Sequence, residues 1–221
     1  MAKAVIFHVD GTLIDTVDLH AASWLETFRH FGVAATFDEV RSQIGKGGDQ
    51  LMPVFVRAEM LEARGEEIEA FRGELFKRDY LPKARGFPKT RELFQRLKAD
   101  GVTIAIGSSC KADELPVYTD LAEVTDLIDV RATSDDAEHS KPYPDIFEAS
   151  LRKLGRPPSE DVVVVGDSPF DAEAAGRAGL RTVGVLCGGF PEEALRAAGC
   201  IAIFRDPASL LEGYAASPLR P

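Results

Sequence analysis

The sequence predicts an α/β protein with an open, doubly wound (Rossmann-like) parallel sheet and a separate α-helical subdomain inserted after the first strand. Two observations carry this prediction. Short apolar runs alternate with amphipathic helical segments over most of the chain, whereas residues 16–80 contain only helical patterns. Because the apolar runs are continuous rather than alternating, they are typical of parallel strands that helices cover on both faces.

The predicted strands are short, rich in Val or Ile, and followed by Gly or a polar turn. Four runs have these features, and a fifth, Ile201–Phe204, is weaker. The four are Lys3–Val9, Val102–Gly107, Asp161–Gly166 and Arg181–Leu186.

Amphipathic helical patterns lie between these strands, and each is followed by a glycine. Glycine commonly ends a helix because it adopts the left-handed conformation without a steric penalty. The predicted helices cover residues 90–100, 144–154, 170–178 and 191–198. Strand and helix therefore alternate as they do in a doubly wound sheet.

The block 16–80 breaks this alternation and predicts a helical subdomain of its own. Its segments "LHAASWLETFRHFG" and "FVRAEMLEARGEEIEAFRGELFKRDYL" are amphipathic at helical spacing, and "LPKARGFP" (81–88) is linker-like. We therefore expect a core formed by residues 1–15 and 81–221, with residues 16–80 inserted into it.

The composition limits the possible partners. A formal net charge of −10 without a basic run argues against binding to nucleic acid, and no apolar segment approaches the ~20 residues that span a bilayer. The three cysteines lack CxxC spacing, which favours a reducing compartment. The N-terminus shows no secretory pattern, so we expect a cytoplasmic protein that works as a monomer or a homodimer.

Polar residues follow the predicted strands where ligands bind in open α/β sheets, at the carboxyl ends. Two or three carboxylates, a lysine and several hydroxyls meet there, and such a set suits a hard cation such as Mg²⁺ together with a phosphoryl group. The residues are His8, Asp10, Gly11 and Thr12 after the first strand, Ser108 and Ser109 after the second, Lys141 before helix 144–154, and Asp167 and Asp171 after the third.

Four segments at these positions resemble the motifs of the haloacid dehalogenase-like hydrolase superfamily. They are "VDGTL", "GSS", "KPYPDIF" and "VVGDSPFDAEAAGRAGL", in the family's order. The helical insert resembles the α-helical cap of that superfamily. Within it, "IGKGGDQL" is similar to the cap loop of phosphoglycolate phosphatases, and "DTVDLHAASW" is similar to the first cap helix of that group and of β-phosphoglucomutases.

The resemblance implies a role for each site residue. Asp10 would be the general acid/base and would ligate Mg²⁺ through its carbonyl, while Asp167 and Asp171 would hold the ion. Ser108 and Lys141 would bind the phosphoryl group that is transferred. Further substrate contacts are expected at Gly11, Thr12, His20, Lys46, Gly47 and Ser109, although Thr12 could serve only as a loop cap, His20 as a packed histidine and Lys46 as part of a flexible turn.

His8 stands where this family has its nucleophilic aspartate, a position that also ligates the metal. One imidazole cannot place one atom on Mg²⁺ and another on phosphorus, because its nitrogens diverge. Burial favours a neutral ring, whereas the neighbouring carboxylates favour imidazolium, which is not nucleophilic. We therefore predict that the chain is catalytically impaired. Attack by a neutral His8 would require a rebuilt reaction geometry.

The sequence thus predicts a Mg²⁺-dependent phosphatase of small phosphorylated metabolites, similar to phosphoglycolate phosphatases. One alternative is a sugar-phosphate mutase, which would want a cap arginine where this loop has Gly48 and Asp49. Another is a non-catalytic protein that binds a phosphorylated ligand on the same fold. Asp10 disfavours dehalogenation. A phosphonate hydrolase would need a cap lysine, and Lys46 is the only nearby candidate.

Overall fold

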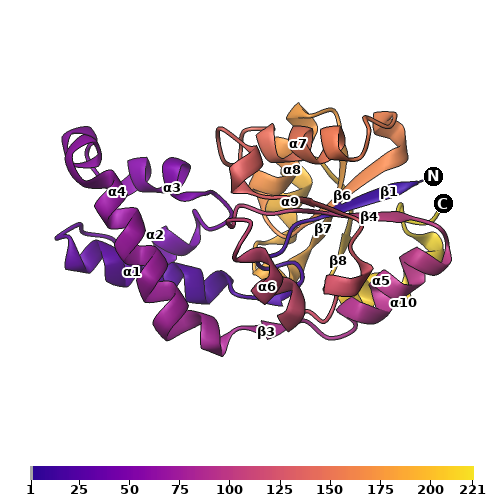
Figure 1. The fold of residues 1–221 in the computed structure, drawn as a ribbon, viewed down its shortest axis with the longest axis horizontal. Helices are drawn as coiled ribbons and strands as arrows, with labels where there is room; N and C mark the ends of the chain where they lie inside the picture. Colours follow the sequence, from indigo (N-terminus) through magenta and orange to yellow (C-terminus); the bar gives the residue numbers. More distant parts are fainter. Residues whose placement is uncertain (1) are drawn as a thin grey trace.

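The computed structural model describes residues 2–221, and its core is one six-stranded parallel sheet (Figure 1). The strand order is β5-β4-β1-β6-β7-β8. The strands are β1 (Ala4–Phe7), β4 (Thr103–Gly107), β5 (Val130–Ala132), β6 (Val162–Gly166), β7 (Arg181–Val185) and β8 (Cys200–Phe204). The predicted fold class is confirmed.

β1 lies at the centre of the sheet, where the direction of winding reverses. It pairs with β4 on one side (Phe7 opposite Ile106) and with β6 on the other (Phe7 opposite Val165). The chain adds β4 and β5 on one side of β1 and β6 to β8 on the other. The loops that follow β1 and its neighbours therefore lead to opposite sides of the sheet. Ligand sites form at this kind of switch point.

Helices cover both faces of the sheet, and successive side chains of β1 pack against the helices on opposite faces. Phe7 packs in an apolar cluster with residues of α5 and α10, while Ile6 packs with residues of α7 and α8. No helix among residues 2–221 is both long and apolar enough to cross a membrane. The helices of the core are α5 (Thr90–Ala99), α6 (Leu115–Leu121), α7 (Asp145–Lys153), α8 (Pro169–Arg177), α9 (Glu192–Ala197) and α10 (Pro207–Glu212).

The five predicted strands and four predicted helices of the core are present, with ends shifted by one or two residues. The structure adds strand β5, which the sequence did not reveal because it has three residues and exposes Arg131 at the sheet edge. It also adds a two-residue pairing of β2 (Ile14–Asp15) with β3 (Arg85–Gly86). These two segments are where the chain leaves the core and returns to it.

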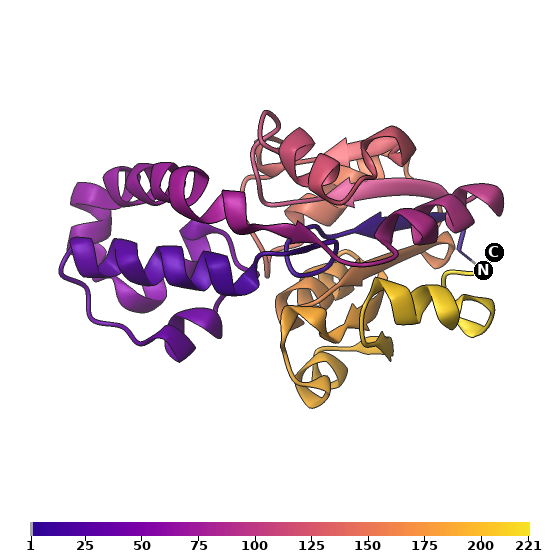
Figure 2. The same cartoon turned by 90° about the horizontal axis from the view of Figure 1, so that it is seen from below.

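Between β2 and β3 the chain is helical and has an apolar cluster of its own. Phe28 and Ile68 are fully buried in this cluster, and Trp24 and Leu51 pack with them. Figures 1 and 2 show the segment, in indigo and purple, to one side of the sheet. It contains α1 (Val17–His30), α2 (Phe37–Arg41), α3 (Gly48–Phe55), α4 (Ala58–Leu75) and a π-helical turn (Phe76–Tyr80).

The separate clusters predict that the insert can lose structure on its own. Phe28→Ala should destabilise the insert by ~3–5 kcal/mol, because it removes a fully buried ring. Native-state hydrogen exchange should then show lost protection in α1 and α4, with protection of β1 and β6 retained.

Phe147→Ala is the matched control, because Phe147 is equally buried but packs on the sheet with Ile6. It should lower protection in the sheet. An equal loss of protection in both parts of the chain for Phe28→Ala would contradict the independence of the insert.

Candidate active site

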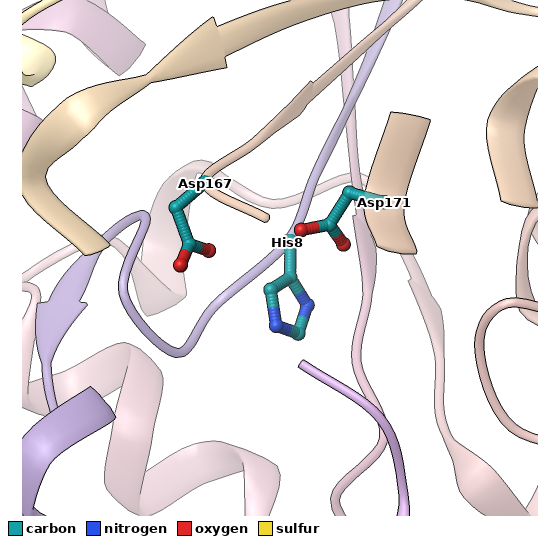
Figure 3. A group of neighbouring side chains, drawn as sticks. All are labelled: His8, Asp167 and Asp171. Atoms are coloured by element: carbon teal, nitrogen blue, oxygen red, sulfur yellow. The ribbon is translucent and has the colours of Figure 1, made fainter. Parts of the chain in front are cut away.

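Three buried side chains meet at the carboxyl ends of β1 and β6. His8 directly follows β1, Asp167 directly follows β6, and Asp171 lies in the first turn of α8. One potential ligand atom from each lies within 4.8 Å of the others, and Figure 3 shows the three side chains together. Each is at most 3% exposed.

The turn after β1 is fitted closely around Asp167. The Thr12 hydroxyl donates to Oδ1 of Asp167 at 2.9 Å. Gly11 has a φ of +73°, and a Cβ there would collide with the Asp167 carboxylate, so only glycine suits both demands. The structure therefore places Gly11 and Thr12 against Asp167, and the Thr12 hydroxyl is engaged by that carboxylate.

Lys141 and Asp171 form a buried ion pair beside this turn. Nζ of Lys141 lies 2.7 Å from Oδ1 of Asp171, and neither side chain is more than 1% exposed. The backbone N–H and the hydroxyl of Ser168 donate to Oδ2 of Asp171 at 3.0 and 2.6 Å. Burial acts to raise the pKa of Asp171, but Lys141 and the hydrogen bond from Ser168 are among the groups that together outweigh it, and the pKa falls to about 2.

Asp167 has no such ion pair, and its pKa is shifted in the opposite direction from that of Asp171. Burial and the nearby Asp171 charge raise the pKa of Asp167 well above its usual range. A divalent cation would relieve this repulsion, and carboxylate oxygens are the ligands Mg²⁺ prefers. His8 fits that ion poorly, because imidazole nitrogen suits Zn²⁺, Cu²⁺, Fe²⁺ or Ni²⁺ better. The donor set thus matches Mg²⁺ at Asp167 and Asp171 and departs from it at position 8.

The imidazole of His8 is held in one orientation by the sheet. Its Nδ1 lies 3.2 Å from the carbonyl oxygen of Gly107, the last residue of β4. Burial and the Lys141 charge lower the pKa of His8, and they outweigh Asp171 and Asp10. Asp171 and Asp10 do favour imidazolium, as expected, but burial together with the Lys141 charge prevails. The ring is neutral, and Nδ1–H donates to Gly107.

Asp10 is held through one oxygen only. Its Oδ1 accepts from the Thr16 hydroxyl at 2.7 Å and lies 2.9 Å from Nε2 of His20, a residue of α1. Burial acts to raise the pKa of Asp10, but the net pKa is lowered, with the hydrogen bonds from His20 and Thr16 favouring the carboxylate. Neither of these contacts uses Oδ2 of the ionised carboxylate.

His20 connects Asp10 to an arginine that the sequence analysis missed. Its ring stacks on Phe76 with centroids 4.2 Å apart. A terminal N–H of Arg72, on α4, points at Nδ1 of His20. Since Nδ1 must accept from a guanidinium, the ring proton lies on Nε2 and is donated to Asp10. Burial lowers the pKa of His20, so this ring is neutral as well.

No motif marks Arg72 or Thr16 in the sequence. Arg72 lies in "EAFRGELF", where it resembles any charged residue of an amphipathic helix. Thr16 precedes α1 and resembles an ordinary helix cap, although its hydroxyl does not cap that helix. The contact of Arg72 with His20 appears only when α4 packs against α1, and that of Thr16 with Asp10 only when the turn after β1 is folded.

The two serines after β4 lie at the same edge of the sheet. Ser108 is fully buried, and its hydroxyl accepts the N–H of Cys110 at 3.2 Å. The same hydroxyl lies 3.2 Å from Sγ of Cys110, while Ser109 is half-buried. Their predicted contacts with substrate stay predictions.

The loop before α3 touches the core beside Lys141. The N–H of Gly47 donates to the Ser140 hydroxyl at 2.9 Å, and Asp49 accepts from the N–H of Ser140 at 3.1 Å. Lys46 donates to Gln43 at 2.6 Å, and its ammonium lies 4.8 Å from the centroid of the Phe170 ring on α8. The loop therefore contacts the core next to Lys141, the predicted phosphate-binding lysine.

Comparison with known proteins identifies this arrangement. The family described as Haloacid dehalogenase-like hydrolase matches residues 5–185. The chain belongs to that family. Pyrophosphatase PpaX of Bacillus velezensis is 32% identical over 186 residues, which cover 82% of each chain.

Two further relatives cover almost the whole chain. The phosphorylated carbohydrates phosphatase of Thermotoga maritima is 28% identical over 204 residues, covering 92% of this chain and 94% of that one. The crystal structure of a hydrolase from Pseudomonas syringae superposes with a TM-score of 0.88 at 26% identity, covering 97% and 98% of the two chains. The family resemblance is confirmed, and with it the prediction of a phosphate-ester hydrolase.

The two neutral imidazoles can be tested in solution. In the metal-free protein, ¹H–¹⁵N NMR titration should give both His8 and His20 a pKa below the ordinary 6.5, because burial disfavours imidazolium at both positions. His8→Asn and His20→Asn variants assign the two resonances. A His8 ring that titrates above 6.5 would contradict the neutral state.

Proposed function

We propose that this chain is built as a Mg²⁺-dependent phosphatase of small phosphorylated metabolites, with residues 16–80 as its cap, and that His8 impairs it. The observation that carries the proposal is the convergence of Asp10, Lys141, Asp167 and Asp171 at one edge of the sheet beneath the helical insert. Relatives that are phosphatases and pyrophosphatases support the same class of substrate.

In this proposal Asp10 is the general acid/base. Thr16 and His20 hold Oδ1, which leaves Oδ2 to exchange a proton with the leaving-group oxygen and then with water. The lowered pKa makes Asp10 a carboxylate in the absence of substrate. It would therefore take up a proton from the bound phosphate ester monoanion, give that proton to the leaving-group oxygen, and afterwards remove a proton from the attacking water.

The phosphoryl group would lie between β1 and β4, with Ser108 and Lys141 as donors to its oxygens. Lys141 is held at Asp171, so its ammonium is fixed in place. Asp167, Asp171 and the carbonyl of Asp10 would hold Mg²⁺, and the bound ion would neutralise charge on the phosphoryl oxygens. Gly11, Thr12, Lys46, Gly47 and Ser109 would enclose the substrate.

His8 weakens this machinery at two points. A neutral imidazole whose Nδ1–H is donated to Gly107 has one free nitrogen, and that atom cannot serve both the metal and phosphorus. A nitrogen ligand also lowers the affinity for Mg²⁺ relative to a carboxylate. We therefore expect both weaker metal binding and slow turnover.

His8 also favours a second candidate, a protein that binds a phosphorylated ligand without turning it over. The donors to a phosphoryl group are the same in both proposals, and only the nucleophile differs. A mutase is less well supported, because the loop has Gly48 and Asp49 where a mutase would want an arginine. Asp49 is hydrogen-bonded to Ser140 instead.

The decisive variant is His8→Asp. With Mg²⁺, it should hydrolyse at least one member of a panel of phosphate monoesters about 10³-fold faster than the His8 chain, because it regains the family nucleophile. Calorimetry should also show tighter Mg²⁺ binding.

His8→Asn is the matched control, because it has nearly the shape of aspartate without a nucleophilic carboxylate, and it should stay slow. Adding Asp10→Asn to the His8→Asp enzyme should abolish the gain. If His8→Asp stays inert while the His8 chain binds phosphate esters, the binding protein is the better account. A fast His8 chain would refute the impairment.

A further inference from the structure

His8 has one ring nitrogen with a free lone pair, and it lies beside two buried carboxylates. Its Nδ1–H is donated to the carbonyl oxygen of Gly107 at 3.2 Å, and no hydrogen bond among residues 2–221 uses Nε2. The side chain is only 3% exposed. Histidines that bind metals have this arrangement, in which one ring nitrogen ligates the ion and the other donates to a backbone carbonyl or a carboxylate. The contact with Gly107 therefore leaves Nε2 ready for a cation.

The two carboxylates beside His8 can also ligate an ion. Asp167 accepts a hydrogen bond at Oδ1, and none from the described residues reaches its Oδ2. Asp171 accepts from Lys141 at Oδ1 and from Ser168 at Oδ2, but each carboxylate oxygen has two lone pairs. One potential ligand atom from each of the three side chains lies within 4.8 Å of the others, so a single ion can contact all three (Figure 3).

This set of ligands differs from a magnesium site in both chemistry and charge. Mg²⁺ takes oxygen ligands in near-octahedral geometry and gives up its water reluctantly. A neutral imidazole at position 8 removes one negative charge where the family has an aspartate, while the Lys141 ammonium remains on Asp171. A hard cation that is held mainly by charge loses most from this change.

A borderline cation loses less, because it gains a nitrogen ligand. Imidazole suits Zn²⁺, and sites with nitrogen and oxygen ligands bind Zn²⁺ more tightly than most other divalent metals. Zinc sites that stay open to a further ligand have three protein ligands, drawn from His and carboxylate side chains, and one position for water. His8, Asp167 and Asp171 supply three ligands of these types.

We propose that the cation site of this chain takes a borderline divalent metal, represented by Zn²⁺, in preference to Mg²⁺, with His8 as its nitrogen ligand beside Asp167 and Asp171. This proposal rests on the proposed function for the placement of a cation at the two aspartates, and it changes the identity of that cation. Cys187 is a rival ligand for Zn²⁺, because its Sγ lies 3.2 Å from the carbonyl oxygen of Gly11 in the turn beside Asp167.

The first test observes His8 directly in the unmodified chain. In ¹H–¹⁵N NMR spectra of the metal-free protein at neutral pH, an equimolar amount of Zn²⁺ should shift the Nε2 resonance of His8 to that of a metal-bound nitrogen, and Nδ1–H should stay in place. An excess of Mg²⁺ should leave Nε2 unshifted. His8→Asn assigns the resonance. A His8 ring that Zn²⁺ does not affect would overturn the proposal.

The second test measures affinity by calorimetry. His8→Asn keeps both aspartates but removes the imidazole, so its affinity for Zn²⁺ should fall at least ~10-fold. His8→Asp should lower the preference for Zn²⁺ over Mg²⁺ by at least ~10-fold, because it exchanges nitrogen for a charged oxygen ligand.

Two control variants remove other groups that attract Zn²⁺. Cys187→Ser removes the neighbouring thiol, and His139→Asn removes a half-exposed histidine that lies 3.5 Å from Asp145 at the surface. Both should leave the affinity for Zn²⁺ unchanged.

Zn²⁺ binding that survives His8→Asn, or that is lost in either control variant, would overturn the proposal. An equal preference for Zn²⁺ over Mg²⁺ in the His8 chain and in His8→Asp would do the same. Failure of the proposed function would appear elsewhere, as a His8→Asp enzyme that turns over no phosphate ester in Mg²⁺ while Zn²⁺ still binds His8 in the unmodified chain.

Discussion

The burial of several carboxylates with a single lysine at the edge of a parallel sheet is the constraint on which the rest of the site depends. Asp167 and Asp171 follow β6 so closely that they cannot separate, and only Asp171 has Lys141 as a partner. The pKa values of the two acids are therefore shifted in opposite directions: that of Asp171 is lowered, so it is ionised, and that of Asp167 is raised. Such a site is poised to accept a cation, and the glycine and threonine of the β1 turn hold Asp167 ready for it.

The helical insert takes part in this site through contacts with the core. Asp10 is held by Thr16 and His20 at the start of the insert, and the loop at Gly47 and Asp49 is held by Ser140, the neighbour of Lys141. The proposed acid/base and the proposed phosphate ligand are thus each joined to the insert. A substrate enclosed there would meet groups from both parts of the chain.

Much of the fold could be predicted from the sequence, because buried parallel strands have continuous apolar sequences and glycines end their helices. β5 could not be predicted, since three residues at a sheet edge leave no pattern. The candidate site residues were located because the carboxyl ends of parallel strands converge. The protonation of His8 was not predictable, because it depends on the depth of burial and on Lys141, which is distant in sequence. Arg72 was missed for a similar reason: its contact with His20 exists only once α4 is packed against α1.

The account makes one central claim, that the strand ends form a complete phosphoryl-transfer site apart from position 8. The most direct measurement is a crystal structure of the His8→Asp variant grown with Mg²⁺ and beryllium fluoride, which imitates a phosphoryl group on a carboxylate. The account predicts beryllium bonded to the introduced aspartate, fluorines within hydrogen-bond distance of Ser108 and Lys141, and Mg²⁺ on Asp167 and Asp171. An adduct that contacts neither Ser108 nor Lys141, or a metal bound away from the two aspartates, would contradict it.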